Sequence, residues 1–317
     1  MTPAGNRGLP VFRRIAPLFA VLLVLAGCAT RPSEDSTAPP ESDGVFPVTV
    51  AAPGAPAVTL DRQPQRIVSL SPSATETLFA LGAGPQVVAV DSASNFPEQA
   101  PRTQLSGLSP DPETIAAYRP DLVVVYADTT GLADALAKTG TKTLVMPDAK
   151  TLDDAYAQFE VLGKATGHQA EGESLARQTR DEIDKIVADT PKRSLTYYWE
   201  LDQTFYSVTA ATFAGQVLTR FGLTNIADGT DPSASGGYPQ LSAERILQSN
   251  PDLIFLADSK CCGQNAQTVA ARPGWNTLTA VQRGQVIALD DDIASRWSPR
   301  IVELVRTVAD AIARTGA

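Results

Sequence analysis

ETIAAYRPDLVVV, residues Glu113–Val125, and ERILQSNPDLIFL, residues Glu244–Leu256, are two copies of one unit. Glutamate, isoleucine, proline, aspartate and leucine recur in both copies at the same internal spacing. In each copy a short helical pattern ends at the proline, which cannot continue a helix, and an apolar strand follows it. Because one copy stands in each half of a 317-residue chain, the sequence predicts two equivalent lobes.

Strands and helices alternate around both copies. We expect strands at 66–70, 86–91, 121–126, 141–148, 194–200, 252–258 and 285–290, and helices after residue 71 and at 112–118, 131–138, 213–222, 241–249 and 298–315. Ser73 and Glu76 fit a capping box for the first helix, and Asp111 and Ser242 are the expected N-caps of the two repeated helices. Strands that are apolar on both faces and separated by helices predict parallel sheets covered on both sides.

One long amphipathic helix is predicted between the halves, at 168–190. Its apolar positions recur at steps of three to four residues among charged ones; they are Leu175, Thr179, Ile183, Ile186 and Val187. We therefore predict an α/β fold with two Rossmann-like lobes, at 58–167 and 191–317. Their parallel-rich sheets are joined by this one backbone helix, and a cleft separates them.

The N-terminus has the pattern of a secretory signal at 1–27. Arginines precede an apolar run, Ile15–Leu25, which is shorter than the roughly 20 residues that a membrane-spanning helix needs. The ending LAGC resembles a bacterial lipobox, which implies lipidation of Cys28; ordinary cleavage that leaves a free Cys28 is the alternative. The segment 28–57 is rich in Pro, Ser and Thr and predicts a flexible tether, so the folded part is expected to start near Val58.

Charge and histidine content exclude several classes of protein. The net charge is −9 and the pI is about 4.7, which argues against nucleic-acid binding. His168 is the one histidine, so a zinc or manganese site built on several histidines is not expected. No G-x-S-x-G motif occurs, and a serine triad would have to use His168 in the linking helix. We expect no enzymatic activity; an extracellular hydrolase is the alternative from that class.

A family resemblance emerges from three stretches taken together. QRIVSLSPSATETLFALGAG at 65–84, the doubled PDL strands and SRWSPRIVELV at 295–305 resemble the iron-siderophore and cobalamin solute-binding proteins of ABC importers. The resemblance implies a monomeric, lipid-anchored protein on the extracytoplasmic face of a bacterial cell membrane. It would capture a metal chelate between its lobes and deliver it to ABC permease subunits with their ATPases. No cofactor is expected, because the metal arrives within the chelate. A sensor or sequestering lipoprotein without its own permease is the alternative.

The repeated glutamates have two interpretations. Each stands in the first turn of its helix, where a carboxylate favours the positive end of the helix dipole. In the family that the sequence resembles, a surface glutamate on each lobe docks onto arginines of the two permease subunits. The resemblance therefore implies that Glu113 and Glu244 are docking residues.

Ligands of open parallel sheets bind beyond the carboxyl ends of the strands, which selects the loops that follow them. From these loops we predict the ligand-binding residues Ser71, Asn95, Phe96, Tyr126, Trp199, Phe205, Tyr206, Asp292, Arg296 and Trp297. The aromatic rings suit a large apolar or flat ligand, unless they pack into the lobe cores. Arg296 is the preferred candidate for ligand oxygens. The acidic run at 290–292 has three interpretations: it holds Arg296 by ion pairing, contacts ligand amides, or forms a solvated loop.

The ligand within the predicted class is a metal chelate. Cobalamin-type relatives place further aromatic residues in the first lobe, where this sequence has Ala93 and Leu108. This departure weakens a cobalamin assignment, whereas SRWSPRI at 295–301 leans toward the cobalamin branch. We favour a ferric siderophore because iron chelates are the broader class, with cobalamin and haem as alternatives.

Two adjacent cysteines, Cys261 and Cys262, follow the strand of the second repeat. With Cys28 used for lipid and an oxidising compartment, they have only each other as partners. A vicinal disulfide that forms a rigid apolar ledge is predicted; two reduced thiols in a turn are the alternative.

Overall fold

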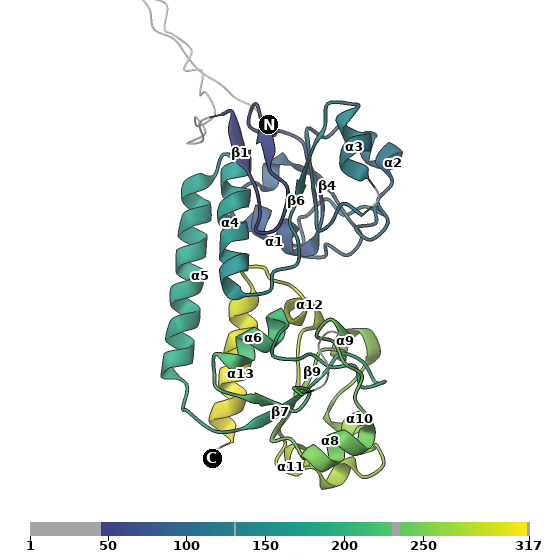
Figure 1. Ribbon diagram of the computed structural model, residues 1–317, viewed down its shortest axis with the longest axis vertical. Coiled ribbons are helices and arrows are strands. Elements are labelled where there is room, and N and C mark those ends of the chain that lie inside the picture. Colours follow the sequence, from purple (N-terminus) through teal and green to yellow (C-terminus); the bar gives the residue numbers. More distant parts are fainter. Residues whose placement is uncertain (1–45, 130, 230–234, 316–317) are drawn as a thin grey trace, which may run out of the picture. The chain divides into compact units, whose positions relative to one another are not determined.

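The computed structural model describes residues 46–129, 131–229 and 235–315, and they form two α/β lobes with a pair of long helices (Figure 1). The first lobe has the sheet order β4-β3-β5-β6, and all three strand pairs are parallel. These strands are β3 (Ile67–Leu70), β4 (Val87–Val90), β5 (Leu122–Val125) and β6 (Lys142–Val145). The helices of this lobe are α1 (Pro72–Ala80), α2 (Pro112–Ala116) and α3 (Leu132–Ala137), with a short 3-10 turn η1 at Gly84–Gln86.

The second lobe repeats the arrangement. Its sheet has the order β10-β9-β7-β8, again with parallel pairs only. The strands are β7 (Thr196–Glu200), β8 (Thr224–Asn225), β9 (Leu253–Leu256) and β10 (Val286–Ala288). Its helices are α6 (Phe213–Thr219), α8 (Ala243–Ser249), α9 (Ser259–Cys262), α10 (Ala266–Ala270), α11 (Thr279–Gln282), α12 (Asp291–Ala294) and α13 (Ile301–Arg314), with a 3-10 turn η2 at Trp275–Thr277. The prediction of two equivalent lobes with parallel sheets is confirmed.

The repeated aspartate has a structural role that is the same in both lobes. Asp121 accepts hydrogen bonds from the backbone N–H groups of Gln65 and Arg66, at 2.9 and 3.0 Å, where β3 begins. Asp252 accepts one from the backbone N–H of Thr196, at 2.9 Å, where β7 begins. Each aspartate therefore joins the start of its own strand to the start of the neighbouring one. This explains the aspartate of the repeated unit without any ligand.

The linking helix is confirmed, but it does not stand alone. α5 (Gln169–Asp189) begins after His168 and packs along α4 (Leu152–Thr166), a helix that the sequence did not lead us to expect. The two helices meet closely at Gly163 and Gly172, where a Cβ on Gly172 would lie 2.9 Å from the carbonyl oxygen of Phe159. Because only glycine fits this crossing, the backbone element is a tightly packed helical pair.

The folded region begins earlier than predicted. β1 (Val48–Val50) pairs antiparallel with β2 (Val58–Leu60), and Val50 is buried in the core of the first lobe. The boundary near Val58 is therefore wrong, and a hairpin occupies part of the segment assigned to the tether. The predicted signal peptide, Cys28 and the rest of the tether lie outside the described residues.

The N-cap interpretation of the first helix is also wrong. Ser71 caps α1 by accepting a hydrogen bond from the backbone N–H of Ala74, whereas Ser73 lies inside the helix. Glu76 does not fold back onto the helix start; its carboxylate reaches residues of the second lobe. The caps Asp111 and Ser242 are confirmed on α2 and α8. Among the described residues, no helix is long and apolar enough to cross a membrane.

Candidate functional site

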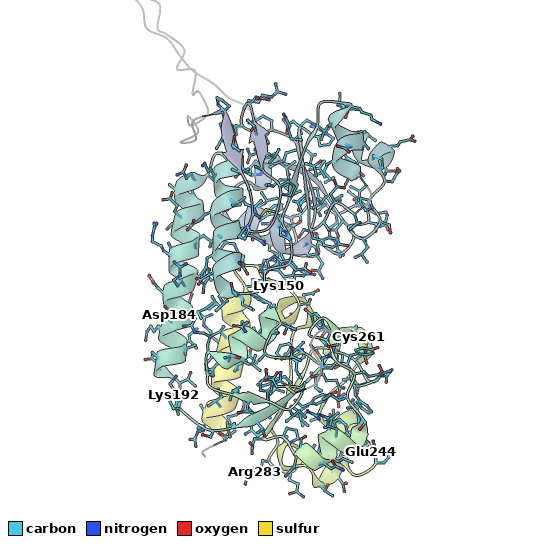
Figure 2. The ribbon with its side chains drawn as sticks, in the orientation of Figure 1. Lys150, Asp184, Lys192, Glu244, Cys261 and Arg283 are labelled. Atoms are coloured by element: carbon cyan, nitrogen blue, oxygen red, sulfur yellow. A yellow bond between two sulfur atoms is a disulfide. The ribbon has the colours of Figure 1, made fainter. Side chains whose placement is uncertain are left out.

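A pocket opens at the carboxyl ends of the strands and has contributions from both lobes. From the first lobe come Asp148, Ala149 and Lys150, which follow β6, and Figure 2 labels Lys150. From the second lobe come Trp199, Leu201, Val208, Ala211, Thr212, Phe213, Ala214, Gly236, Tyr238, Ala257, Ala294, Ser295 and Trp297. The cavity volume is about 310 Å³. Four of the lining side chains are aromatic and seven more are alanine, valine or leucine, so most of the wall is apolar.

The aromatic walls are fixed by their contacts. The indole Nε1 of Trp297 donates a hydrogen bond to Oε1 of Gln158, at 2.9 Å, and the Trp297 ring meets Phe213 edge-on at 6.5 Å between centroids. Trp199 is fully buried on β7 and packs against Phe255 at 6.0 Å. Because their surroundings hold these rings before any ligand arrives, little conformational entropy is lost on binding.

The polar groups of the pocket carry opposite charges. Asp148 and Lys150 are both exposed at its first-lobe side, one residue apart. Burial, followed by the negative charge of Asp148, raises the pKa of the Tyr238 hydroxyl, so this phenol stays neutral. The charges of Asp148 and Lys150 therefore cancel, and the neutral Tyr238 adds none.

Beside the pocket, a buried ion-pair cluster joins the two lobes; we call it the Glu76 cluster, and it consists of Glu76, Asn95, Asp292, Arg296 and Arg300. Oε1 of Glu76 accepts hydrogen bonds from Nη1 of Arg296, at 2.7 Å, and from Nη2 of Arg300, at 2.5 Å. Oε2 accepts from Nε of Arg300, at 2.9 Å, and from the hydroxyl of Ser298. Four donors therefore surround one carboxylate.

Arg296 has the opposite situation, a cation surrounded by acceptors. Its Nη1 also donates to Oδ1 of Asn95, at 2.8 Å, and its Nη2 donates to the Ala93 carbonyl, at 3.0 Å, and to Oδ1 of Asp292, at 2.7 Å. Its side chain is only 7% exposed. Both terminal nitrogens of the guanidinium are thus used within the protein. Of the three interpretations of the acidic run at 290–292, the structure shows the first, an ion pair between Asp292 and Arg296.

Asp292 is stabilised as an anion. Burial by itself would raise the pKa of this carboxyl, but the hydrogen bond from Asn95 and the charges of Arg296 and Lys260 hold that pKa below its ordinary value. Lys260 also pairs with Asp290, at 2.6 Å. Lys260 and Arg296 therefore balance the negative charges of Asp290 and Asp292.

The predicted ligand residues divide into three groups. Trp199 and Trp297 line the pocket. Asn95, Asp292 and Arg296 belong to the Glu76 cluster, and Phe96, which is 42% exposed, lies under the guanidinium of Arg300 at 4.1 Å. The others do not line the pocket: Ser71 is a buried helix cap, Tyr126 is half-buried after β5, and Phe205 and Tyr206 lie elsewhere.

Phe205 belongs to a separate aromatic group on the second lobe. Its ring stacks on Trp275 at 5.5 Å, and the guanidinium of Arg272 lies 4.6 Å from the Trp275 ring. Arg272 forms a two-pronged ion pair with the buried carboxylate of Glu200, with both distances 2.6 Å. Tyr206, the next residue in the chain, is exposed. Phe205 therefore follows the alternative interpretation of the predicted aromatic residues, in which the ring packs into the core of its lobe.

The vicinal disulfide is confirmed between Cys261 and Cys262 (Figure 2 labels Cys261). Both cysteines are exposed in α9, and Asp291 accepts hydrogen bonds from the backbone N–H groups of Ser259, Lys260 and Cys261. Neither cysteine lines the pocket, so the pocket gives no support to a disulfide ledge under the ligand. That role of the disulfide stays a prediction.

Glu113 and Glu244 are exposed in the first turns of α2 and α8, as the repeated unit predicts. Figure 2 labels Glu244 on the surface of the second lobe. For these two residues the helix-dipole and docking interpretations are compatible, since a side chain in the first turn of a helix can point outward.

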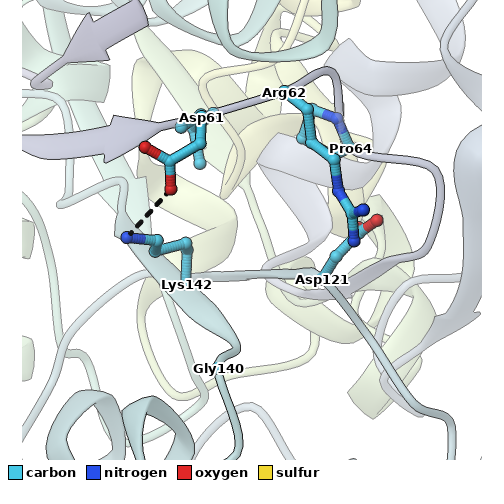
Figure 3. A pocket seen from close by; sticks show the side chains of 7 residues that line it. Asp61, Arg62, Pro64, Asp121, Gly140 and Lys142 are labelled. Atoms are coloured by element: carbon cyan, nitrogen blue, oxygen red, sulfur yellow. Dashed lines mark ion pairs between the residues drawn. The ribbon is translucent and has the colours of Figure 1, made fainter. Parts of the chain in front are cut away.

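A second hollow, at the amino ends of the first-lobe strands, has a different character. It is lined by Leu60, Asp61, Arg62, Pro64, Asp121, Gly140 and Lys142 (Figure 3). Lys142 and Asp61 form an exposed ion pair across it, at 3.7 Å. Polar, solvent-exposed walls without an aromatic ring do not suit an apolar ligand, so we assign the ligand site to the aromatic pocket.

Sequence reasoning missed several pocket residues. Asp148 and Lys150 follow β6, and the rule that selected the other strand ends would have selected this loop as well. Phe213 and Tyr238 carry no such signal, because neither follows a strand directly. Within the described part of the chain, no group of three or more His, Cys, Asp or Glu side chains could hold a metal ion.

Comparisons with known proteins agree on one family. The profile of the periplasmic binding protein family matches residues 67–293. YvrC of Bacillus subtilis, described as an uncharacterized ABC transporter substrate-binding lipoprotein, is 28% identical over 308 residues, with 94% of this chain and 95% of the relative covered. A cobalamin-binding protein of Halobacterium salinarum is 30% identical over 282 residues, with 85% and 75% covered. Among solved structures, the periplasmic vitamin B12-binding protein BtuF of Vibrio cholerae matches with a TM-score of 0.64 and 26% identity, over 79% of this chain and 97% of that one.

Proposed function

Because this chain belongs to the periplasmic binding protein family, we propose that it captures a metal chelate in the aromatic pocket and delivers it to an ABC importer. The observation that carries the proposal is the pocket itself. It stands at the carboxyl ends of the strands, takes residues from both lobes, and is walled by Trp199, Phe213, Tyr238 and Trp297. Concave apolar sites with a few polar groups are typical of small-molecule binding. We propose no catalytic role.

Two considerations bear on which chelate binds. The absence of first-lobe aromatics at Ala93 and Leu108 favours a ferric siderophore, whereas the names of the cobalamin-binding relatives favour a corrinoid. The cavity volume of about 310 Å³ is near the lower end of ligand sites. We therefore expect part of a larger chelate, rather than the whole of it, to occupy the pocket. Corrinoids, ferric siderophores and haem are the three classes to test.

Tryptophan fluorescence tests the proposal directly, because two of the three tryptophans line the pocket. We expect saturable quenching by at least one metal-loaded chelate and none by its metal-free form. Trp297→Phe should remove part of that quenching. If no chelate of the three classes gives saturable quenching or a heat signal on titration, the proposed function is wrong.

Delivery to a permease is proposed to depend on Glu113 and Glu244. A carboxylate on each equivalent lobe can present one contact to each of two permease subunits. The double charge reversal Glu113→Arg and Glu244→Arg should abolish stimulation of the importer's ATPase and leave chelate affinity unchanged. Glu160→Arg, on an exposed face of α4, is the matched control. Undiminished transport by the double variant would exclude the docking role and favour a sensor or sequestering protein.

Anchoring is proposed to use lipid on Cys28, which lies outside the described residues. In cell fractionation, the full chain should be recovered with membranes, and a Cys28→Ser variant should be recovered in the soluble extracytoplasmic fraction. Recovery of both proteins in the same fraction would contradict lipid anchoring.

A further inference from the structure

The Glu76 cluster has the composition of an anion-binding site that the protein itself has filled. Arg296 and Arg300 present two guanidinium groups side by side, an arrangement that binds carboxylate and other oxyanions strongly. The anion in that position is the side chain of Glu76, which is buried on α1 of the opposite lobe. No part of this carboxylate is spare, since both oxygens accept two hydrogen bonds.

The cluster stands directly beside the pocket. Ser295 and Trp297, the neighbours of Arg296 in the chain, both line the pocket. The backbone N–H of Trp297 also donates to the hydroxyl of Ser73, at 3.3 Å, so this turn is held against α1. Arg296 therefore lies between two pocket-lining residues in the chain, and the carboxylate of Glu76 occupies the oxyanion position between Arg296 and Arg300.

The charges of the cluster cancel. Glu76 and Asp292 contribute two negative charges, and Arg296 and Arg300 contribute two positive ones. An anionic group of a ligand could reach the guanidinium groups only by displacing Glu76. The displaced carboxylate would then be left buried without a partner. An unpaired buried charge costs far more free energy than the loss of a contact at the exposed surface.

We propose that Glu76 is the specificity-determining residue that makes this pocket select chelates without anionic groups. The ligand class is then a metal chelate whose periphery is neutral, with amide or hydroxamate groups, rather than carboxylate or catecholate groups. This inference rests on the proposed function and adds the charge of the ligand to it. Substituting Glu76 by glutamine should open the two arginines to ligand oxyanions.

The test uses two pairs of ligands, and in each pair one member is neutral and the other is anionic. One pair is cobalamin and its monocarboxylate, in which one peripheral amide is hydrolysed. The other is a neutral ferric trihydroxamate and an anionic ferric tris-catecholate. For the unmodified protein, titration calorimetry should show tighter binding of the neutral member by at least about tenfold in whichever pair binds. In Glu76→Gln this preference should vanish or reverse.

Two further variants separate charge from structure. Glu76→Asp keeps the carboxylate and should keep the preference, and Glu160→Gln removes an equal charge from the exposed surface of α4 and should also keep it. Equal or tighter binding of the anionic member by the unmodified protein would overturn the inference, and so would an unchanged preference in folded Glu76→Gln. If that variant does not fold, the ratio for the unmodified protein decides. Absence of binding by all four ligands, and by haem as well, would instead count against the proposed function.

Discussion

Asp258 provides a sharp test of how this structure responds to pH. It follows β9, next to pocket residue Ala257, and its side chain is fully buried. Among the described residues, neither of its carboxyl oxygens has a hydrogen-bond partner. Burial first, and then the negative charges of Glu200 and Asp291, raise the pKa of Asp258 to about 7 against the opposing positive charge of Arg272. We therefore expect this carboxyl to be protonated in the folded protein below neutral pH.

The sign of the effect follows from the two pKa values. The folded pKa lies above the ordinary value of 3.8, so the folded state binds more protons than the unfolded state between those pH values. The stabilisation from Asp258 is fully present below the unfolded pKa and is lost as the pH rises through the folded pKa. Each pH unit in this window changes the unfolding free energy by about 1.4 kcal/mol. From pH 5 to pH 7 the loss should be about 2–3 kcal/mol.

The assay is urea denaturation of the unmodified protein and of Asp258→Asn at pH 5, 6, 7 and 8. Asparagine imitates the neutral carboxyl and does not titrate, so the stability of this variant relative to the unmodified protein should increase across the series. Asp310→Asn, an exposed position on α13, should show a flat difference and is the control. A flat difference for Asp258→Asn would refute a buried, neutral carboxyl at this position.

Three further outcomes are expected. Gly172→Ala should lower the unfolding free energy, measured in urea, by about 1–3 kcal/mol, because its Cβ would lie 2.9 Å from the carbonyl oxygen of Phe159. The usual result of this change in a helix is stabilisation, and stabilisation here would contradict the close helix crossing. Trp297→Ala should weaken chelate binding by about 10- to 100-fold in calorimetric titration, and unchanged affinity would remove this ring from the site. In a chain lacking the first 28 residues, thiol titration of the denatured protein should find no thiol before reduction and two after it; two before reduction would mean that Cys261 and Cys262 are not bonded.

Features that depend on a short window of sequence could be predicted. The repeated unit, the buried strands and the caps Asp111 and Ser242 each arise from neighbouring residues, and the structure has them where the sequence places them. The linking helix is of the same kind, because its apolar stripe is a local periodicity. The vicinal disulfide also needs only adjacent residues.

The candidate site was predicted only in part. The rule about strand ends selected Trp199 and Trp297, and both line the pocket, but the rule cannot say which side chains of a loop turn inward. Phe205 packs on Trp275 instead. Tyr238 and Phe213 reach the pocket from positions with no local signal.

By itself, the sequence determined two similar α/β halves, the helix between them and the family, since local periodicity and short motifs specify these. Only the tertiary structure decided the role of Glu76. Its spacing from Ser73 satisfies a helix cap, yet its carboxylate pairs with arginines 220 and 224 residues away. The physical reason is that an ion pair depends on distance in space, and a buried carboxylate takes whichever cation the fold brings near it.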